Sequence, residues 1–342
     1  MGTRRGKSRR LMDSETAPAV APAVTPAVTP SGTAGGQRLS FPRYAWALLG
    51  YTLLVILFGA VVRITGSGAG CGQHWPSCNG ELLQMPQTLK TAIEYTHRAT
   101  SGLSVIAICG LLAGALRLYP RGHAVRRAAY LACAMILVEA LIGALLVKLR
   151  LVENDASFGR ILVLPLHLIS TAVLTAALTW CAYFASPGAA STRSVTGTAR
   201  SLLVLAGLGI LLVSATGAVT ALGDTVYPVH ASGLSARLQE DQGASANLLQ
   251  RMRDIHPFLA LAVAAFVVYA AALLPAYCPG RAVKRASQLV AGAVSLQVLV
   301  GVCNVFFSAP GPLQVAHLLS ANLAWIALIL LAASALRAEP DR

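Results

Sequence analysis

RITGSGAGCGQHWPSC (residues 63–78) and IEYTHR (residues 93–98) enclose a short polar connection between two long apolar runs. The stretch contains two cysteines, a carboxylate three residues before a histidine, and a glycine-rich exit from the first apolar run. Most of the sequence around it is apolar. Groups able to carry chemistry are therefore concentrated where one apolar run ends and the next begins.

The sequence on either side has the composition of a membrane protein. Of its 342 residues, 56% are hydrophobic and only 12% are charged. Apolar runs of about 20 residues can cross a bilayer as helices, and these runs lack the alternation of barrel strands. The sequence predicts an all-α polytopic membrane protein with eight transmembrane helices, at roughly 44–62, 97–118, 124–147, 163–184, 200–221, 256–275, 285–305 and 313–335.

The net charge of +14 is distributed unevenly along the chain. Most Lys and Arg residues fall in the N-terminal tail, in alternate loops and at the C-terminus, whereas acids on the other loops nearly cancel the basic residues there. An excess of Lys and Arg marks the cytoplasmic side of a membrane protein. We therefore expect a plasma-membrane protein with both termini in the cytoplasm. This distribution argues against nucleic-acid binding as the reason for the charge.

The two ends of the chain are predicted to lie outside the helices. Residues 1–43 begin with a basic cluster and continue as a Pro/Ala/Val/Thr-rich repeat, which is expected to be a disordered cytoplasmic tail. No apolar segment follows the cluster until after Arg43, so no cleaved signal peptide is predicted. Residues 337–342 are expected to form a second, short cytoplasmic tail.

The spans divide into two similar halves, residues 44–185 and 200–336, joined by a predicted cytoplasmic linker at 186–199. A long and consistent repeat indicates internal duplication. Four helices per repeat is an even number, so the halves should be tandem four-helix bundles in parallel orientation, related by an axis along the membrane normal. The matched pairs are Gly59 with Gly217, His97 with His256, Glu139 with Gln297, Gly143 with Gly301, and His167 with His317.

Four of the seven histidines take part in this repeat: His97, His167, His256 and His317. Each lies near the outer start of a predicted helix, so each half should present two imidazoles toward the outer face. A single such histidine could be a packed core residue, but two pairs in register favour a functional site. Two imidazoles from different helices suit the axial positions of a haem iron, whereas tetrahedral zinc would need further ligands. We therefore expect two haem sites.

The two halves differ beside the first histidine of each pair. Glu94 lies one helical turn before His97, and Arg253 stands at the corresponding place before His256. A carboxylate there could act as an acid or base or stabilise a cation, and a solvated helix-start residue is the alternative. This difference predicts a reactive haem in the first half and a tightly held one in the second. The basic candidates for binding a haem propionate, or for a structural role, are Arg63, Arg98 and Arg253.

Cys71 and Cys78 lie in the predicted first outer loop, where an oxidising compartment permits a disulfide. The other five cysteines fall in spans or on the inner side. A small disulfide ring near a haem could be a structural staple or a redox relay, and a metal site shared with His74 is less favoured.

Glu139 lies within a span, where a charge is costly unless it is protonated or paired. We expect it to face the bundle and to hydrogen-bond as a neutral acid, with a role in a proton path left open.

These motifs resemble those of the bacterial haem A synthases of the cytochrome oxidase assembly family, over roughly residues 44–335. The resemblance rests on RITGSGAGCGQHWPSCNG, IEYTHR, the PLH and QVAHLLSAN segments and the four-plus-four duplication. It implies oxidation of the C8 methyl of haem O to a formyl group through successive hydroxylations, which gives haem A. Haem O would be the substrate and haem b the cofactor.

The resemblance also implies roles and partners. By position, His97 and His167 would hold the substrate haem, Glu94 would be catalytic, and His256 and His317 would ligate the iron of haem b. The implied partners are a haem O synthase (farnesyltransferase) as substrate donor, cytochrome c oxidase assembly factors and a membrane electron acceptor. A homo-oligomer is left open.

The sequence departs from the family pattern at two places. Cys71 and Cys78 match the first-loop pair, but the second outer loop, about 222–255, contains no cysteine for a second pair. Glu139 stands where a glutamine like its repeat-mate Gln297 is expected.

Two other classes of protein fit parts of the pattern. A di-haem b electron-transfer cytochrome would use the same histidines without changing either haem, and the difference between Glu94 and Arg253 argues against it. A membrane transporter with parallel repeats would explain the duplication and buried acids, but it predicts polar sites at mid-membrane and broken helices.

Overall fold

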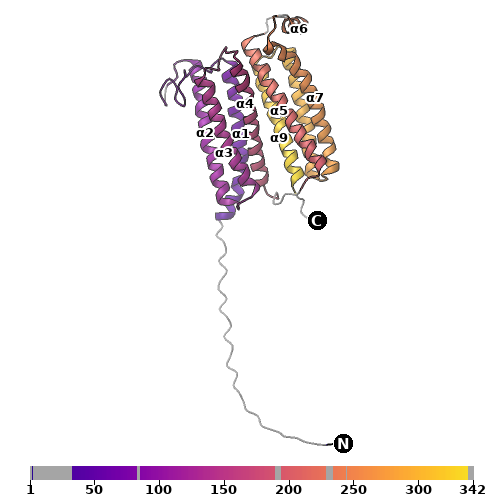
Figure 1. The fold of residues 1–342 in the computed structure, drawn as a ribbon. Coiled ribbons are helices and arrows are strands. Elements are labelled where there is room, and N and C mark those ends of the chain that lie inside the picture. Colours follow the sequence, from indigo (N-terminus) through magenta and orange to yellow (C-terminus); the bar gives the residue numbers. More distant parts are fainter. Residues whose placement is uncertain are drawn as a thin grey trace.

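The computed structural model describes Gly2 and residues 33–82, 85–188, 194–228, 234–243 and 245–337. In this part of the chain all regular structure is helical, apart from one isolated bridge between Cys78 and Glu81. Eight of the described helices are long and apolar enough to cross a membrane, which confirms the predicted all-α polytopic fold. The helices, shown in Figure 1, are α1 (Thr33–Ile64), α2 (Leu89–Leu118), α3 (Ala124–Lys148), α4 (Phe158–Ala185), α5 (Gly197–Val226), α6 (Leu234–Gln242), α7 (Leu248–Tyr277), α8 (Arg281–Phe306) and α9 (Gly311–Leu336).

Two features differ from the sequence-based expectations. Residues 33–43, assigned above to the disordered tail, belong to α1. Phe41 is buried there, because its ring packs edge-on against Tyr119 at 5.4 Å between centroids. The rest of that tail, apart from Gly2, lies outside the described residues. The second difference is the short helix α6, which no pattern in the sequence predicted.

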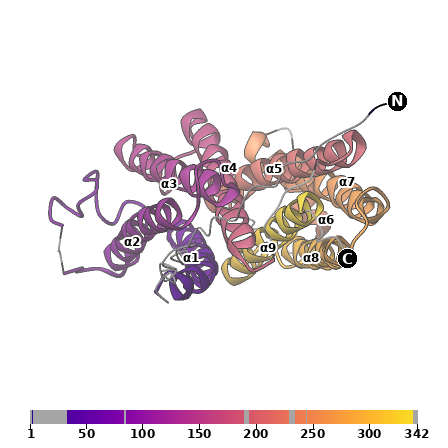
Figure 2. The ribbon, with the colours of Figure 1, turned by 90° about the horizontal axis from the view of Figure 1, so that it is seen from below.

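The eight long helices pack as two groups of four. In the first group α1 and α3 each contact both α2 and α4, and in the second group α5 and α8 each contact both α7 and α9. This arrangement puts α2 and α4 at opposite corners of the first group, and α7 and α9 at opposite corners of the second. Figure 2 shows the groups side by side, with α4, α5 and α9 along the seam. The axis that relates the halves stays a prediction.

Side-chain caps start three of the four histidine-bearing helices. Thr88 accepts a hydrogen bond from the Thr91 amide at the start of α2, and Ser157 caps α4 in the same way. At α7, Asn247 and Gln250 form a reciprocal capping box. Each such cap contributes about 1 kcal/mol. Together they fix where each helix begins, and so the height of its histidine.

The main buried apolar cluster of each group lies toward one end. The buried apolar clusters take residues from the starts of α1, α3, α5 and α8 and from the last turns of α2, α4, α7 and α9. We call this end the terminal end, because α1 begins and α9 finishes there (Figure 1). The opposite end, which carries the 65–88 loop and α6, is called the loop end.

The part of α1 nearest the loop end is only partly buried. Residues 55–64 of α1 are all half-buried, with none in the buried class. Ten consecutive helical residues cover every face of a helix, so this set includes the face turned toward the interior. The histidines lie within about the first three turns of α2, α4, α7 and α9, which begin at this end. His97 lies beside this half-buried part of α1, because Gly59 closely approaches its ring.

Candidate functional site

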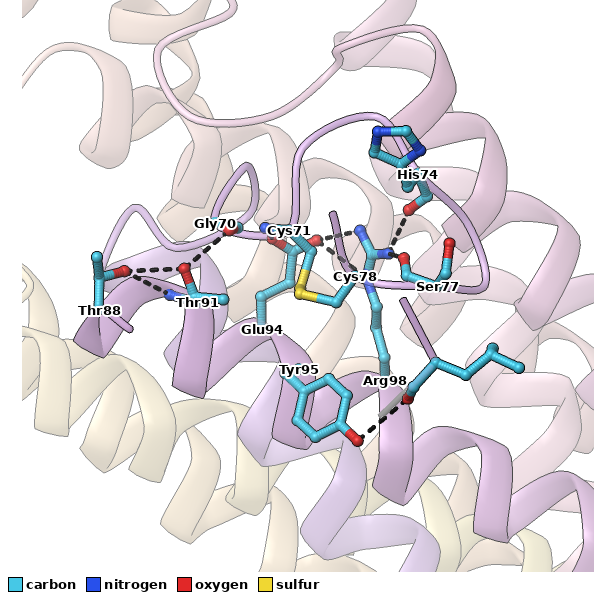
Figure 3. Close-up of a disulfide and its surroundings, with 11 residues drawn as sticks. Gly70, Cys71, His74, Ser77, Cys78, Thr88, Thr91, Glu94, Tyr95 and Arg98 are labelled. Carbon is cyan, nitrogen blue, oxygen red and sulfur yellow. Dashed lines mark hydrogen bonds and ion pairs between the residues drawn. A yellow bond between two sulfur atoms is a disulfide. The ribbon is translucent and has the colours of Figure 1, made fainter. Parts of the chain in front are cut away.

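A disulfide-closed loop lies over the loop end of α2. Cys71 and Cys78 are joined by a disulfide (Figure 3), and both residues are almost completely buried. A Cβ added at Gly70 would lie 2.7 Å from the Lys90 backbone, so only glycine lets the loop approach α2 this closely. Thr91 Oγ1 then donates to the Gly70 carbonyl at 2.9 Å. The loop is thus docked on the first turn of the helix that carries His97.

Glu94 on α2 binds this loop through both carboxylate oxygens, directly and through Arg98. Its Oε2 accepts from the Cys71 amide at 2.8 Å, and its Oε1 accepts from Arg98 Nε at 3.1 Å (Figure 3). Arg98 Nη1 in turn donates to the Ser77 carbonyl at 2.7 Å and to the His74 carbonyl. Glu94 is only 3% exposed, so the alternative of a solvated helix-start residue is wrong.

Arg253 anchors the loop of the second half, as Glu94 anchors the loop of the first, but it is basic instead of acidic. Its Nε lies 2.9 Å from Asp224 Oδ1, Nη1 donates to Asp241 Oδ1 at 2.8 Å, and Nη2 donates to the Gly223 carbonyl at 2.9 Å and to the Tyr227 carbonyl. These partners tie the end of α5 and the helix α6 to α7. The matched residues Glu94 and Arg253 therefore both anchor a loop one turn before a histidine, which favours the structural alternative for Arg253.

The second loop repeats the close backbone approach of the first. A Cβ at Gly223 would lie 2.6 Å from the Leu249 carbonyl oxygen, and Leu249 is the second residue of α7. Lys90, which Gly70 approaches, is the second residue of α2. The duplication seen in the sequence is thus also present in how each loop meets its helix.

The structure brings the histidines together in the predicted pairs. His97 on α2 and His167 on α4 stand on opposite corners of the first group, and His256 on α7 and His317 on α9 stand on opposite corners of the second. In each half, two imidazoles from diagonally opposed helices thus face a common interior.

Glycines on neighbouring helices set the positions of three of these rings. A Cβ at any of them would lie 3.0–3.1 Å from the Cε1 atom of the imidazole, closer than ordinary packing allows. The pairs are Gly59 with His97, Gly217 with His256, and Gly301 with His317. The duplication already matched Gly59 with Gly217 in the sequence, but only the structure shows that each one seats a histidine.

Polar side chains contact nitrogen atoms of three of the rings. Thr216 Oγ1 lies 3.1 Å from His256 Nδ1, a contact that the sequence did not predict. Glu139 Oε2 lies 3.0 Å from His167 Nδ1, and Gln297 Nε2 lies 3.2 Å from His317 Nε2. Glu139 therefore faces the bundle as expected, and the protonation state expected for it stays a prediction.

The residues fit haem better than a protein-ligated metal ion. Nδ1 of His97 and Nδ1 of His317 are buried without a hydrogen-bond partner, so these rings have uncommitted nitrogen atoms. Across the described ranges, no group of three or more His, Cys, Asp or Glu side chains could hold a metal ion. Paired imidazoles with glycines beside the rings suit a flat, large ligand with two axial positions.

Arg63 joins the two halves at the loop end. Its Nη1 donates to the Ala221 carbonyl at 2.9 Å and to Thr225 Oγ1 at 2.6 Å, and its Nη2 donates to Gln314 Oε1 at 2.7 Å. Ala221 and Thr225 lie on α5 and Gln314 lies on α9, so one side chain from α1 binds two helices of the other half. Of the two roles predicted for Arg63, the geometry favours the structural one.

Fold and site together define a multi-pass helical membrane protein with a pair of histidines inside each of two helix groups. The sequence profile of the family described as cytochrome oxidase assembly protein matches residues 42–329, so the chain belongs to that family, as the resemblance indicated.

Two kinds of named relatives are similar to this chain. Proteins from two strains of Thermus thermophilus, each named protoheme IX farnesyltransferase, are 41% identical over 299 residues, which are 87% of this chain and 49% of the relative. The chain thus spans about half the length of these relatives. A Bacillus cereus protein named heme A synthase is 39% identical over 92 residues, which are 27% of this chain and 30% of the relative.

Proposed function

We propose that this protein is a haem A synthase, an oxidoreductase that converts the C8 methyl of haem O into a formyl group. The observation that carries the proposal is the presence of one imidazole pair in each half, at the same end of the bundle. Family membership and the name of the Bacillus cereus relative support it.

The two imidazole pairs would have different tasks. His97 and His167 would hold haem O as substrate, and His256 and His317 would hold haem b as cofactor. Haem b would supply one-electron redox chemistry when bound. The difference between Glu94 and Arg253 supports this division, because only the first half places a carboxylate one turn from a histidine.

Glu94 would act on the substrate as a fixed charge. Its two oxygens are held by the Cys71 amide and by Arg98, so the carboxylate cannot turn freely. Each carboxylate oxygen has more than one acceptor site, so capacity to accept a proton or stabilise a cation remains. A preorganised charge in a low-dielectric site is effective because it needs no reorganisation during the reaction.

The Thermus thermophilus names raise the alternative of farnesyl transfer. Transfer from a diphosphate would use Mg²⁺ held by carboxylates and phosphate oxygens. The chain has only 13 Asp and Glu residues, and no two aspartates lie close together in sequence, although Glu153 is near Asp155 and Glu240 is next to Asp241. The match covers 49% of those relatives, so the other half of each can carry the named activity. We assign this chain to the following step, with a farnesyltransferase as the partner that supplies haem O.

The remaining partners follow from the reaction. Oxidation of a methyl group to a formyl group with water as the oxygen source releases about four electrons and four protons, so it would require a membrane electron acceptor. The product would pass to cytochrome c oxidase assembly factors. For the disulfide, the burial of both sulfur-bearing residues supports a staple over a relay, because thiol exchange requires access to a sulfur atom.

The test uses the full chain in a host that makes haem O but no haem A. Mass analysis of extracted haem should show haem A and its hydroxylated precursor. His97→Ala is the matched control and should retain haem b in the second half while producing no haem A. A protein with both haem sites filled and only unmodified haems would instead be a di-haem electron-transfer cytochrome.

A further inference from the structure

The second histidine of each pair has a different neighbour in the two halves. Glu139 on α3 contacts His167, and its repeat-mate Gln297 on α8 contacts His317. The two side chains have nearly the same shape, but only the glutamate can carry a charge. The two contacts differ in the functional group and also in the ring nitrogen, because Glu139 Oε2 lies beside Nδ1 of His167 whereas Gln297 Nε2 lies beside Nε2 of His317.

The surroundings of Glu139 match that difference. Ser170 Oγ donates to Glu139 Oε1, as Ser320 Oγ donates to Gln297 Oε1 in the other half. The first half adds Thr171, whose Oγ1 donates to Glu139 Oε2 at 2.8 Å. The position that corresponds to Thr171 is Ala321, which has no hydroxyl. An extra donor therefore accompanies the carboxylate, as expected for a group with two acceptor oxygens.

Glu139 is also directed at the ring of His167. Its Oε2 lies 3.0 Å from His167 Nδ1, although the ring N–H is not aligned for a full hydrogen bond. The Glu139 side chain is only 13% exposed, so a negative charge on it would be weakly screened by water. When one imidazole nitrogen binds a metal, a carboxylate beside the other nitrogen fixes the ring orientation and raises the donor strength of the metal-binding nitrogen.

We propose that Glu139 is a positioning residue that makes His167 a stronger iron donor than His317, so that the two haem sites differ in reduction potential. The inference rests on the proposed function, because it requires iron at these histidines. A stronger donor stabilises oxidised iron and so lowers the reduction potential. The first-half haem, beside Glu139, therefore has a lower reduction potential than the second-half haem, beside Gln297.

A purely structural role for Glu139 makes a different prediction. The carboxylate also joins α3 to α4 through two hydroxyls, so its loss could weaken that helix contact alone. A structural role would lower thermal stability but leave the potential and the spectrum of the bound haem unchanged. Gln297 indicates that a glutamine fits beside a serine in this setting, so Glu139→Gln should fold.

The experiment exchanges the two groups in the full chain, loaded with haem b. Glu139→Gln and Gln297→Glu are each combined with His256→Ala or His97→Ala, so that a single haem remains and can be assigned to one half. Redox titration and low-temperature electron paramagnetic resonance are the measurements. We expect Glu139→Gln to raise the potential of the first-half haem and weaken its binding about tenfold, and Gln297→Glu to lower the potential of the second-half haem.

Each outcome decides the proposal. Unchanged potential and unchanged resonance in Glu139→Gln at full haem occupancy would overturn it. If Glu139→Gln loses the first-half haem, a lowered second-half potential in Gln297→Glu still supports it, and an unchanged one overturns it. Failure of the proposed function is distinguishable, since a wild-type chain that makes no haem A can still display both shifts. A wild-type chain that binds no haem overturns both.

Discussion

Replacing Glu94 with glutamine should release the disulfide loop and slow haem oxidation together. Glu94 uses one oxygen for the Cys71 amide and the other for Arg98. Glutamine has only one acceptor oxygen, so either a buried amide or a buried guanidinium loses its partner. Arg98 keeps its bonds to the Ser77 and His74 carbonyls, which places the cost at the lower end of the range for a broken buried ion pair, about 3 kcal/mol.

A cost of about 3 kcal/mol corresponds to roughly a 10²-fold increase in loop opening. Hydrogen exchange of the protein in nanodiscs should detect it as faster exchange of the Cys71 amide. Conversion of haem O should fall by about 10²-fold or more, the usual range for a positioned acid or base, with haem O and the singly hydroxylated species accumulating.

The matched control for Glu94→Gln is Arg253→Gln, which should loosen the second loop and leave exchange at Cys71 unchanged. Normal haem A production and normal Cys71 exchange in Glu94→Gln, at equal protein level and haem b content, would refute this account of Glu94. Faster exchange with normal haem A production would show that Glu94 is an anchor without a catalytic role.

Three further experiments test the site. His256→Ala should remove low-spin haem b and activity, and full haem b content would contradict the ligand assignment. Alkylation before and after reduction should find Cys71 and Cys78 protected until reductant is added, whereas free thiols in membranes isolated without reductant would exclude the disulfide. Gly59→Ala should displace the His97 ring by a few tenths of an ångström, because the new Cβ lies 3.1 Å from Cε1. Haem content of the first half should fall, and unchanged content would show that the ring has room to shift.

Hydropathy was enough to predict the spans, and the duplication placed the four histidines on matched helices. Each span satisfies its own backbone, so a run of apolar residues suffices to predict it. The match of His97 with His256 and of His167 with His317 gave the pairs, because repeated helices place equivalent residues at equivalent heights. These properties are local, or depend on one regular repeat.

The roles of the charged residues depended on contacts that no local pattern encodes. The Glu94–Arg98 spacing is compatible with a salt bridge, yet the partners that decide its role are backbone groups in a loop that folds back. Arg63 follows an apolar run like any residue at a helix end, and its partners lie on α5 and α9 of the other half. Phe41, in the segment assigned to the tail, packs against Tyr119 at the end of α2, a contact between residues far apart in sequence.

The tight packing at the terminal end has a consequence for biogenesis. The clusters that hold each group together lie away from the histidines, so the helices can associate as soon as they are inserted, before any haem is present. Under the function proposed above, haem loading would then be a late maturation step on a chain that is already assembled. A cell short of iron would be expected to accumulate a stable, haem-free precursor instead of degrading an unfolded one.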